Sequence, residues 1–112
     1  MLLTAVILFL IAAGFGAVVL FSILQDKPTP KKFVYTHGSI AVIALLMVLY
    51  YAFMHPDHVP LASIVLFLIA AAGGITMFFI DMPGRPVPKW LALLHPVIAI
   101  AAVLALVVFI LG

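Results

Sequence analysis

Four long apolar segments occupy almost the whole chain and alternate with three short polar segments. Each apolar segment has about the 20 residues that an α-helix needs to cross the hydrocarbon core of a bilayer. The segments cover residues 2–24, 33–54, 60–81 and 89–111. This pattern predicts an all-α fold, an integral membrane four-helix bundle that forms a single transmembrane domain over residues 1–112.

The composition supports this interpretation and excludes several classes of protein. Hydrophobic residues make up 69% of the chain and charged residues 7%, too few to cover the surface of a soluble domain. The first apolar segment lacks a basic start, and its copy lies inside the chain, so we expect a retained helix rather than a signal peptide. The absence of cysteine excludes disulfides and thiolate metal sites. The net charge of +2 does not call for a nucleic-acid partner.

The second half of the chain repeats the first without a gap, at an offset of 58 residues. Lys27–Gly38 reads KPTPKKFVYTHG, and Arg85–Pro96 reads RPVPKWLALLHP. Both segments contain a basic residue, two prolines, a lysine and, six residues later, a histidine. Each repeat, 1–54 or 59–112, holds two spans, so the copies have the same orientation and should be related by a pseudo-twofold axis along the membrane normal. The second and fourth helices should then be parallel neighbours, with their histidines at one depth.

The basic residues predict the orientation in the membrane. All five lie in or beside two loops: Lys27, Lys31, Lys32, Arg85 and Lys89. By the positive-inside rule, loops 25–32 and 82–88 face the cytoplasm and both termini face outward. We therefore expect a multi-pass cell membrane protein, with the lipid bilayer as its first partner.

An ionisable residue inside a membrane span is a functional candidate, and each of His37 and His95 is the obvious partner of the other. Each histidine lies about 9 Å along its helix from the loop lysine, at 1.5 Å per residue. Small residues surround the pair, and they either let helices touch or leave space for a flat group. They are Gly16, Gly74, Ala41, Ala44, Ala99 and Ala102. Thr36 and Ser39 are candidate partners for an imidazole N–H.

A pair of imidazoles from facing helices can serve as the two axial ligands of haem iron. On His37 and His95 the chain resembles the small bis-His b-type membrane cytochromes, and the resemblance is architectural. It implies haem b as the cofactor, His37 and His95 as iron ligands, and electron transfer or haem handling as the function. One pair implies one haem per bundle, and this interpretation requires the second and fourth helices to be neighbours. The cations at the inner rim suit the anionic propionates of haem: Lys31, Lys32, Arg85 and Lys89.

Other interpretations stay open at this point. The histidine pair could be a protonation site or a structural contact. The chain has the size of a small four-helix membrane transporter, but its acids, Asp26, Asp57 and Asp81, all lie at span ends. A scaffold subunit without a cofactor is the third class. His55 and His58 have a spacing that can hold a metal, although solvated loop residues are the simpler interpretation. A quinone or another redox partner, and a homodimer that shares a haem, are also compatible with the sequence.

Overall fold

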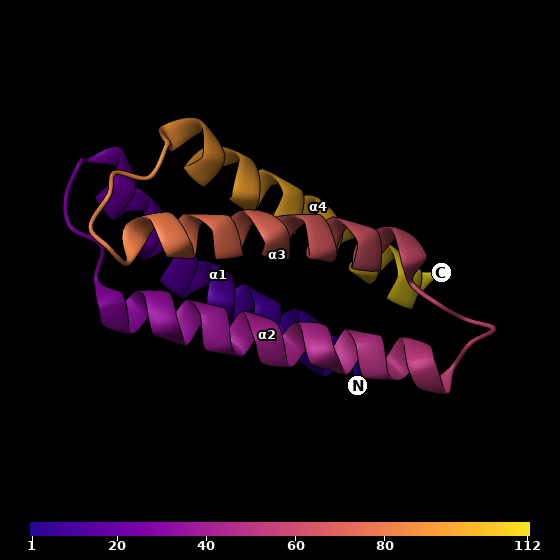
Figure 1. The fold of residues 1–112 in the computed structure, drawn as a ribbon. Coiled ribbons are helices and arrows are strands. Elements are labelled where there is room, and N and C mark those ends of the chain that lie inside the picture. The colour runs from indigo at the N-terminus through magenta and orange to yellow at the C-terminus, as the bar shows by residue number, and fades with distance from the viewer.

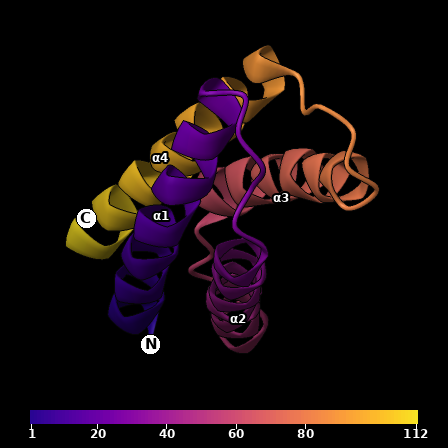
Figure 2. The same cartoon turned by 90° about the vertical axis from the view of Figure 1, so that its left-hand side faces the viewer.

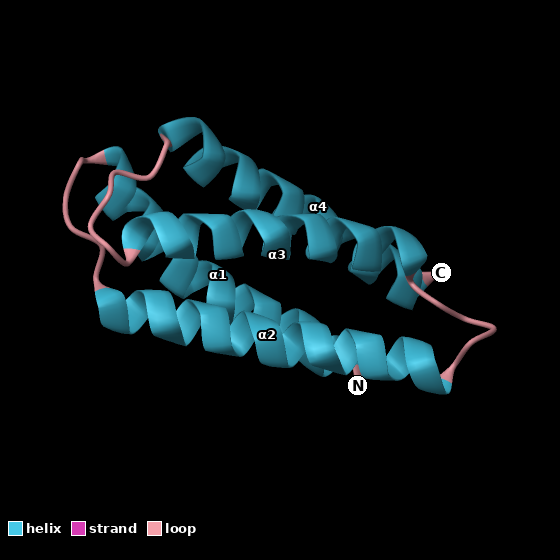
Figure 3. Ribbon diagram, in the orientation of Figure 1, coloured by secondary structure: helices cyan, strands magenta, loops and turns pink.

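A computed structural model describes residues 1–112 and contains four α-helices joined by loops, without a strand (Figure 3). The helices are α1 (Leu2–Leu24), α2 (Lys31–Met54), α3 (Leu61–Asp81) and α4 (Lys89–Leu111). A proline directly precedes each of the last three, where a missing backbone N–H costs no helical hydrogen bond. All four helices are long and apolar enough to cross a membrane. The prediction of four long apolar helices is confirmed, and α2 begins two residues earlier than its apolar segment suggests.

The helices surround a common axis in chain order, so that each contacts the helix before and after it and α4 returns to α1 (Figures 1 and 2). Both termini lie at the same end of the bundle as the loop between α2 and α3, and the two basic loops lie at the other end (Figure 1). The backbones of α2 and α4 do not contact each other, because these helices are diagonally opposed. The expectation that they are neighbours is therefore wrong. Consecutive helices that are antiparallel and joined by short loops tend to pack against each other.

The packed core occupies the half of the bundle nearest the termini. Its centre is a stack between Phe9 of α1 and Phe67 of α3, whose ring centroids are 4.0 Å apart with planes at 10°. Ten buried residues form this core: Leu2, Ala5, Val6, Phe9, Ala44, Val48, Ile64, Phe67, Ala102 and Leu106. Buried Ser63 donates a hydrogen bond to the carbonyl of Ala102 at 3.0 Å and ties α3 to α4. None of the ten core residues lies between the histidines and the basic loops.

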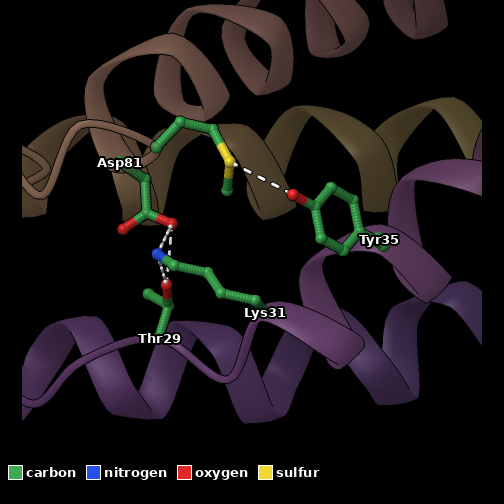
Figure 4. Close-up of polar contacts among 5 residues, drawn as sticks. Thr29, Lys31, Tyr35 and Asp81 are labelled. Carbon is green, nitrogen blue, oxygen red and sulfur yellow. Dashed lines mark hydrogen bonds and ion pairs between the residues drawn. The ribbon is translucent and has the colours of Figure 1, made fainter.

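Polar contacts at the opposite end of the bundle include two ion pairs, and each ion pair joins the two halves of the chain. The Lys31 ammonium lies 2.7 Å from Asp81, and the Thr29 hydroxyl donates to the same carboxylate at 2.7 Å (Figure 4). Lys31 also donates to the Thr29 hydroxyl at 2.7 Å. A second pair, Lys89 with Asp26, has a separation of 3.2 Å. Each repeat therefore supplies a lysine to one pair and a carboxylate to the other.

The two ion pairs should contribute unequally to stability. The Asp81 side chain is 15% exposed, whereas that of Asp26 is 78% exposed. Asp81→Ala leaves Lys31 and Thr29 without their shared acceptor, so we expect a loss of about 1–3 kcal/mol. Asp26→Ala should cost no more than about 1 kcal/mol, as for other exposed ion pairs. Thermal unfolding of both variants in the same detergent measures the difference, and equal losses would contradict it.

Candidate functional site

His37 of α2 and His95 of α4 face each other across the bundle axis. Their ring centroids are 6.0 Å apart and their planes make an angle of 82°. Both side chains are half-buried, and they lie on the basic-loop side of the packed core. Since α2 and α4 are diagonally opposed, the two imidazoles reach the centre from opposite sides.

Each imidazole is fixed by a hydrogen bond to the helix that precedes its own. The Nδ1 atom of His37 lies 2.8 Å from the carbonyl oxygen of Ala12, and the Nδ1 atom of His95 lies 2.8 Å from that of Ala70. A carbonyl oxygen only accepts, so Nδ1 carries the proton in both rings. In the neutral imidazole the Nε2 atom then has a free lone pair. No group of the chain donates a hydrogen bond to either Nε2 atom.

Two glycines make these hydrogen bonds possible. In an α-helix the carbonyl of residue i points toward residue i+4, so Gly16 follows the carbonyl of Ala12 and Gly74 follows that of Ala70. A Cβ atom on Gly16 would lie 3.0 Å from both Nδ1 and Cε1 of His37, and one on Gly74 would lie 3.1 Å from Cε1 of His95. The missing side chains therefore give each ring access to its carbonyl.

The predicted alanines do not share one role. Ala44 and Ala102 are fully buried members of the packed core, whereas Ala41 and Ala99, one turn after each histidine, are half-buried. Thr36, a candidate partner of the imidazoles, instead donates to the carbonyl of Lys32 in its own helix. The carbonyls of Ala12 and Ala70 are the hydrogen-bond partners of the two imidazoles, and the sequence did not predict them. The glycine that follows each alanine by four residues is the signal that could have found them.

The four rim cations fall into two groups. Lys31 and Lys89 are bound to acids of the other half of the chain, as described above. Lys32 and Arg85 make no ion pair and are exposed. Sequence reasoning gave Asp26 and Asp81 no part in the site.

The loop histidines lie at the far end of the bundle. His55 stacks on Tyr51 with ring centroids 4.2 Å apart, and His58 lies against Phe109 at 4.3 Å. No group of three or more His, Asp or Glu side chains is placed to hold a metal ion, at this end or elsewhere. His37 and His95 are the two histidines whose rings meet inside the bundle. Comparison with protein-family models, curated proteins and solved structures finds no match for the chain.

Proposed function

We propose that this chain is an integral membrane protein that binds haem b through His37 and His95 and serves electron transfer or haem handling. One observation carries the proposal: both imidazoles donate their Nδ1 proton to a neighbouring carbonyl, which leaves both Nε2 lone pairs without a partner. A carbonyl or carboxylate on the second ring nitrogen is the usual way in which proteins orient a metal-binding histidine.

The separation of the rings fits two ligands of one metal ion. Imidazole nitrogens bind metals at about 2.0–2.1 Å, so two rings on opposite sides of one ion have centroids about 6 Å apart. The centroids of His37 and His95 are 6.0 Å apart. The haem interpretation of the sequence required α2 and α4 to be neighbours, and the structure places them diagonally instead. The proposal is kept because the two imidazoles still meet at the bundle axis, where they could reach one ion from opposite sides. Haem held there supplies reversible one-electron chemistry, with a potential set by its ligands and surroundings.

The two halves of the chain are, in this proposal, related by a pseudo-twofold axis along the bundle. Several features recur at the 58-residue offset. The two histidine–carbonyl bonds both have lengths of 2.8 Å. Asp26 and Gly84, at equivalent positions, have positive φ angles of 57° and 85°. Such an axis brings equivalent groups together at the centre, as in the contact of His37 with His95. The propionates would lie nearest the unpaired cations Lys32 and Arg85.

The topology that follows has both termini outside and the two basic loops in the cytoplasm, by the positive-inside rule. The native chain has no cysteine, so single cysteines report on one position each. In intact cells, a membrane-impermeant maleimide should modify Asp57→Cys and spare Pro28→Cys, both of which replace exposed residues. Permeabilised cells, in which both should react, are the control. The reverse pattern in intact cells would contradict the proposed orientation.

The direct test of the function is the visible absorption spectrum of detergent-purified protein expressed with ample haem supply. We expect a Soret band and the sharp reduced bands of a low-spin, six-coordinate haem, at one haem per chain. A transporter or a cofactor-free scaffold predicts a colourless protein. The carboxylates do not favour a transporter, since Asp26 and Asp81 are both held by lysines at the end of the bundle.

A further inference from the structure

The two halves differ most where α2 meets α3. Under the proposed axis this contact is equivalent to the contact between α4 and α1, yet α2 and α3 pack together over a much shorter length. A groove of about 460 Å³ lies along the outer side of α2 at this contact, with Phe78 of α3 on its other wall. That volume is in the range of sites that bind small molecules.

The residues of this groove depart from the repeat. Its wall contains Tyr35, Gly38 and Ser39 from α2, where the equivalent positions of α4 hold Leu93, Pro96 and Val97. Phe78 is matched by Leu20. The aliphatic residues occur on the side where the helices are in more extensive contact, although Leu93 and Val97 are themselves 47% and 62% exposed. The histidines are the same in both halves, whereas these groove positions differ.

The groove passes beside the candidate haem ligand, although His37 itself does not line it. Gly38 lines it, and His37 is the preceding residue. A Cβ atom on Gly38 would have no neighbour within 4 Å, so the backbone there is open to the outside of the bundle. Ser22, Thr36 and Thr76 each donate to the carbonyl four residues before them, whereas the Ser39 hydroxyl makes no such bond and is free to contact a ligand.

Polar contacts hold α2 and α3 together only at the loop end of this groove. Lys31 and Thr29 bind Asp81, and the Tyr35 hydroxyl lies 3.5 Å from the sulfur of Met82 (Figure 4). Deeper along the helices the contact depends on the Tyr35 and Phe78 rings, whose centroids are 6.1 Å apart. Along the groove the contact between α2 and α3 therefore depends on side-chain packing and not on polar bonds.

We infer that the groove between α2 and α3 is the lateral route by which haem dissolved in the bilayer reaches His37 and His95. This inference rests on the proposed haem-binding function. A flat apolar ring partitions into lipid, and the side of the bundle with the fewest helix contacts and no side chain at Gly38 opposes its passage least. On the α1–α4 side the two helices are in more extensive contact.

Two crosslinked variants separate the two sides of the bundle. Tyr35→Cys/Phe78→Cys joins α2 to α3, and the repeat-equivalent Leu93→Cys/Leu20→Cys joins α4 to α1. Apo-protein in lipid nanodiscs is treated with a bis-maleimide, and haemin is then added. Uptake is followed by the Soret band and by quenching of Trp90, the single tryptophan. The α2–α3 crosslink should slow uptake by about tenfold or more, which corresponds to an added barrier of about 1.4 kcal/mol. The α4–α1 crosslink should not.

A second pair of variants tests the route without a crosslink. Gly38→Leu places a side chain in the groove, whereas Gly14→Leu places one on α1, where a Cβ atom also meets nothing within 4 Å. Only Gly38→Leu should slow uptake, and protein loaded during expression should keep its spectrum in every variant. Equal slowing by both members of a pair, or by neither, would overturn the route while leaving haem binding intact. A wild-type protein that takes up no haem would overturn both proposals.

Discussion

Replacement of His37 or His95 by alanine is expected to abolish the low-spin spectrum of the haem-loaded protein. The two Nε2 atoms are the ligand donors of the proposed site, and each comes from a different helix on a different side of the bundle axis. One imidazole leaves the sixth coordination position to water or to nothing, and neither gives a low-spin iron with two histidine ligands. The measurement is the visible spectrum of each variant in its oxidised and reduced forms.

The loop histidines provide the matched controls. His55→Ala and His58→Ala remove imidazoles that stack on Tyr51 and Phe109 at the other end of the bundle. Their spectra should equal that of the native protein. Loss of the low-spin bands in these two variants, with retention in His37→Ala and His95→Ala, would move the haem away from the proposed site.

A loss of fold must be separated from a loss of ligand. Circular dichroism should show the same helix content in His95→Ala as in the native protein, because most of the packed core lies nearer the termini. Added imidazole should restore six-coordination in this variant if the truncated side chain was a ligand. Failure of imidazole to restore the spectrum, in a variant that is still helical and still holds haem, would favour a structural role for the pair.

The sequence predicts which segments are helical more completely than it predicts how they are arranged. Long apolar segments bounded by loops that contain proline predict the bounds of the four helices to within about two residues. Their side chains are apolar on nearly all faces, however, and an amphipathic stripe is the signal that identifies the inner face of a helix. The diagonal relation of α2 to α4 therefore could not be read from the pattern.

Part of the candidate site could be predicted because residues that recur in both halves are identified by the repeat, even without an amphipathic pattern. Gly16 with Gly74, and His37 with His95, recur at one offset among many substitutable apolar residues. The ion pairs could not be found in this way. Asp26 aligns with Gly84 and Asp81 with Ile23, so neither carboxylate has a counterpart in the other half. Each binds a lysine more than 45 residues away in the chain, a distance at which spacing carries no information.

Replacement of the two glycines that lie against the imidazoles is expected to destabilise the protein. Gly16→Ala adds a Cβ atom 3.0 Å from Nδ1 and Cε1 of His37, closer than ordinary van der Waals contact. The ring is bound to the Ala12 carbonyl at 2.8 Å, so moving it away from the added Cβ atom strains that hydrogen bond. Overpacking of this kind costs about 1–3 kcal/mol. Gly74→Ala should act in the same way on His95, with its Cβ atom 3.1 Å from Cε1.

The chain offers a matched glycine beside each of these. A Cβ atom on Gly14 would have no neighbour within 4 Å, and one on Gly73 would lie 3.9 Å from the Nδ1 atom of His95, an ordinary contact. Alanine is the better helix former by about 0.8–1.0 kcal/mol. Gly14→Ala should therefore raise the thermal unfolding midpoint in detergent, and Gly16→Ala should lower it. The sequence agrees with a stabilising effect of Gly14→Ala, since Ala72 occupies the equivalent position in the second half.

The haem spectrum gives the glycine variants a second measurement that distinguishes ligand geometry from general stability. Gly16→Ala and Gly74→Ala should weaken haem retention by about tenfold, or about 1.4 kcal/mol, because they displace the ring whose Nε2 atom binds iron. Gly14→Ala and Gly73→Ala should leave retention unchanged. If all four variants retained haem equally, the glycines would serve helix packing alone, and the hydrogen bonds to Ala12 and Ala70 would no longer support a ligand pair. If only Gly16→Ala and Gly74→Ala lost haem, the fixed imidazoles would be the feature on which binding depends.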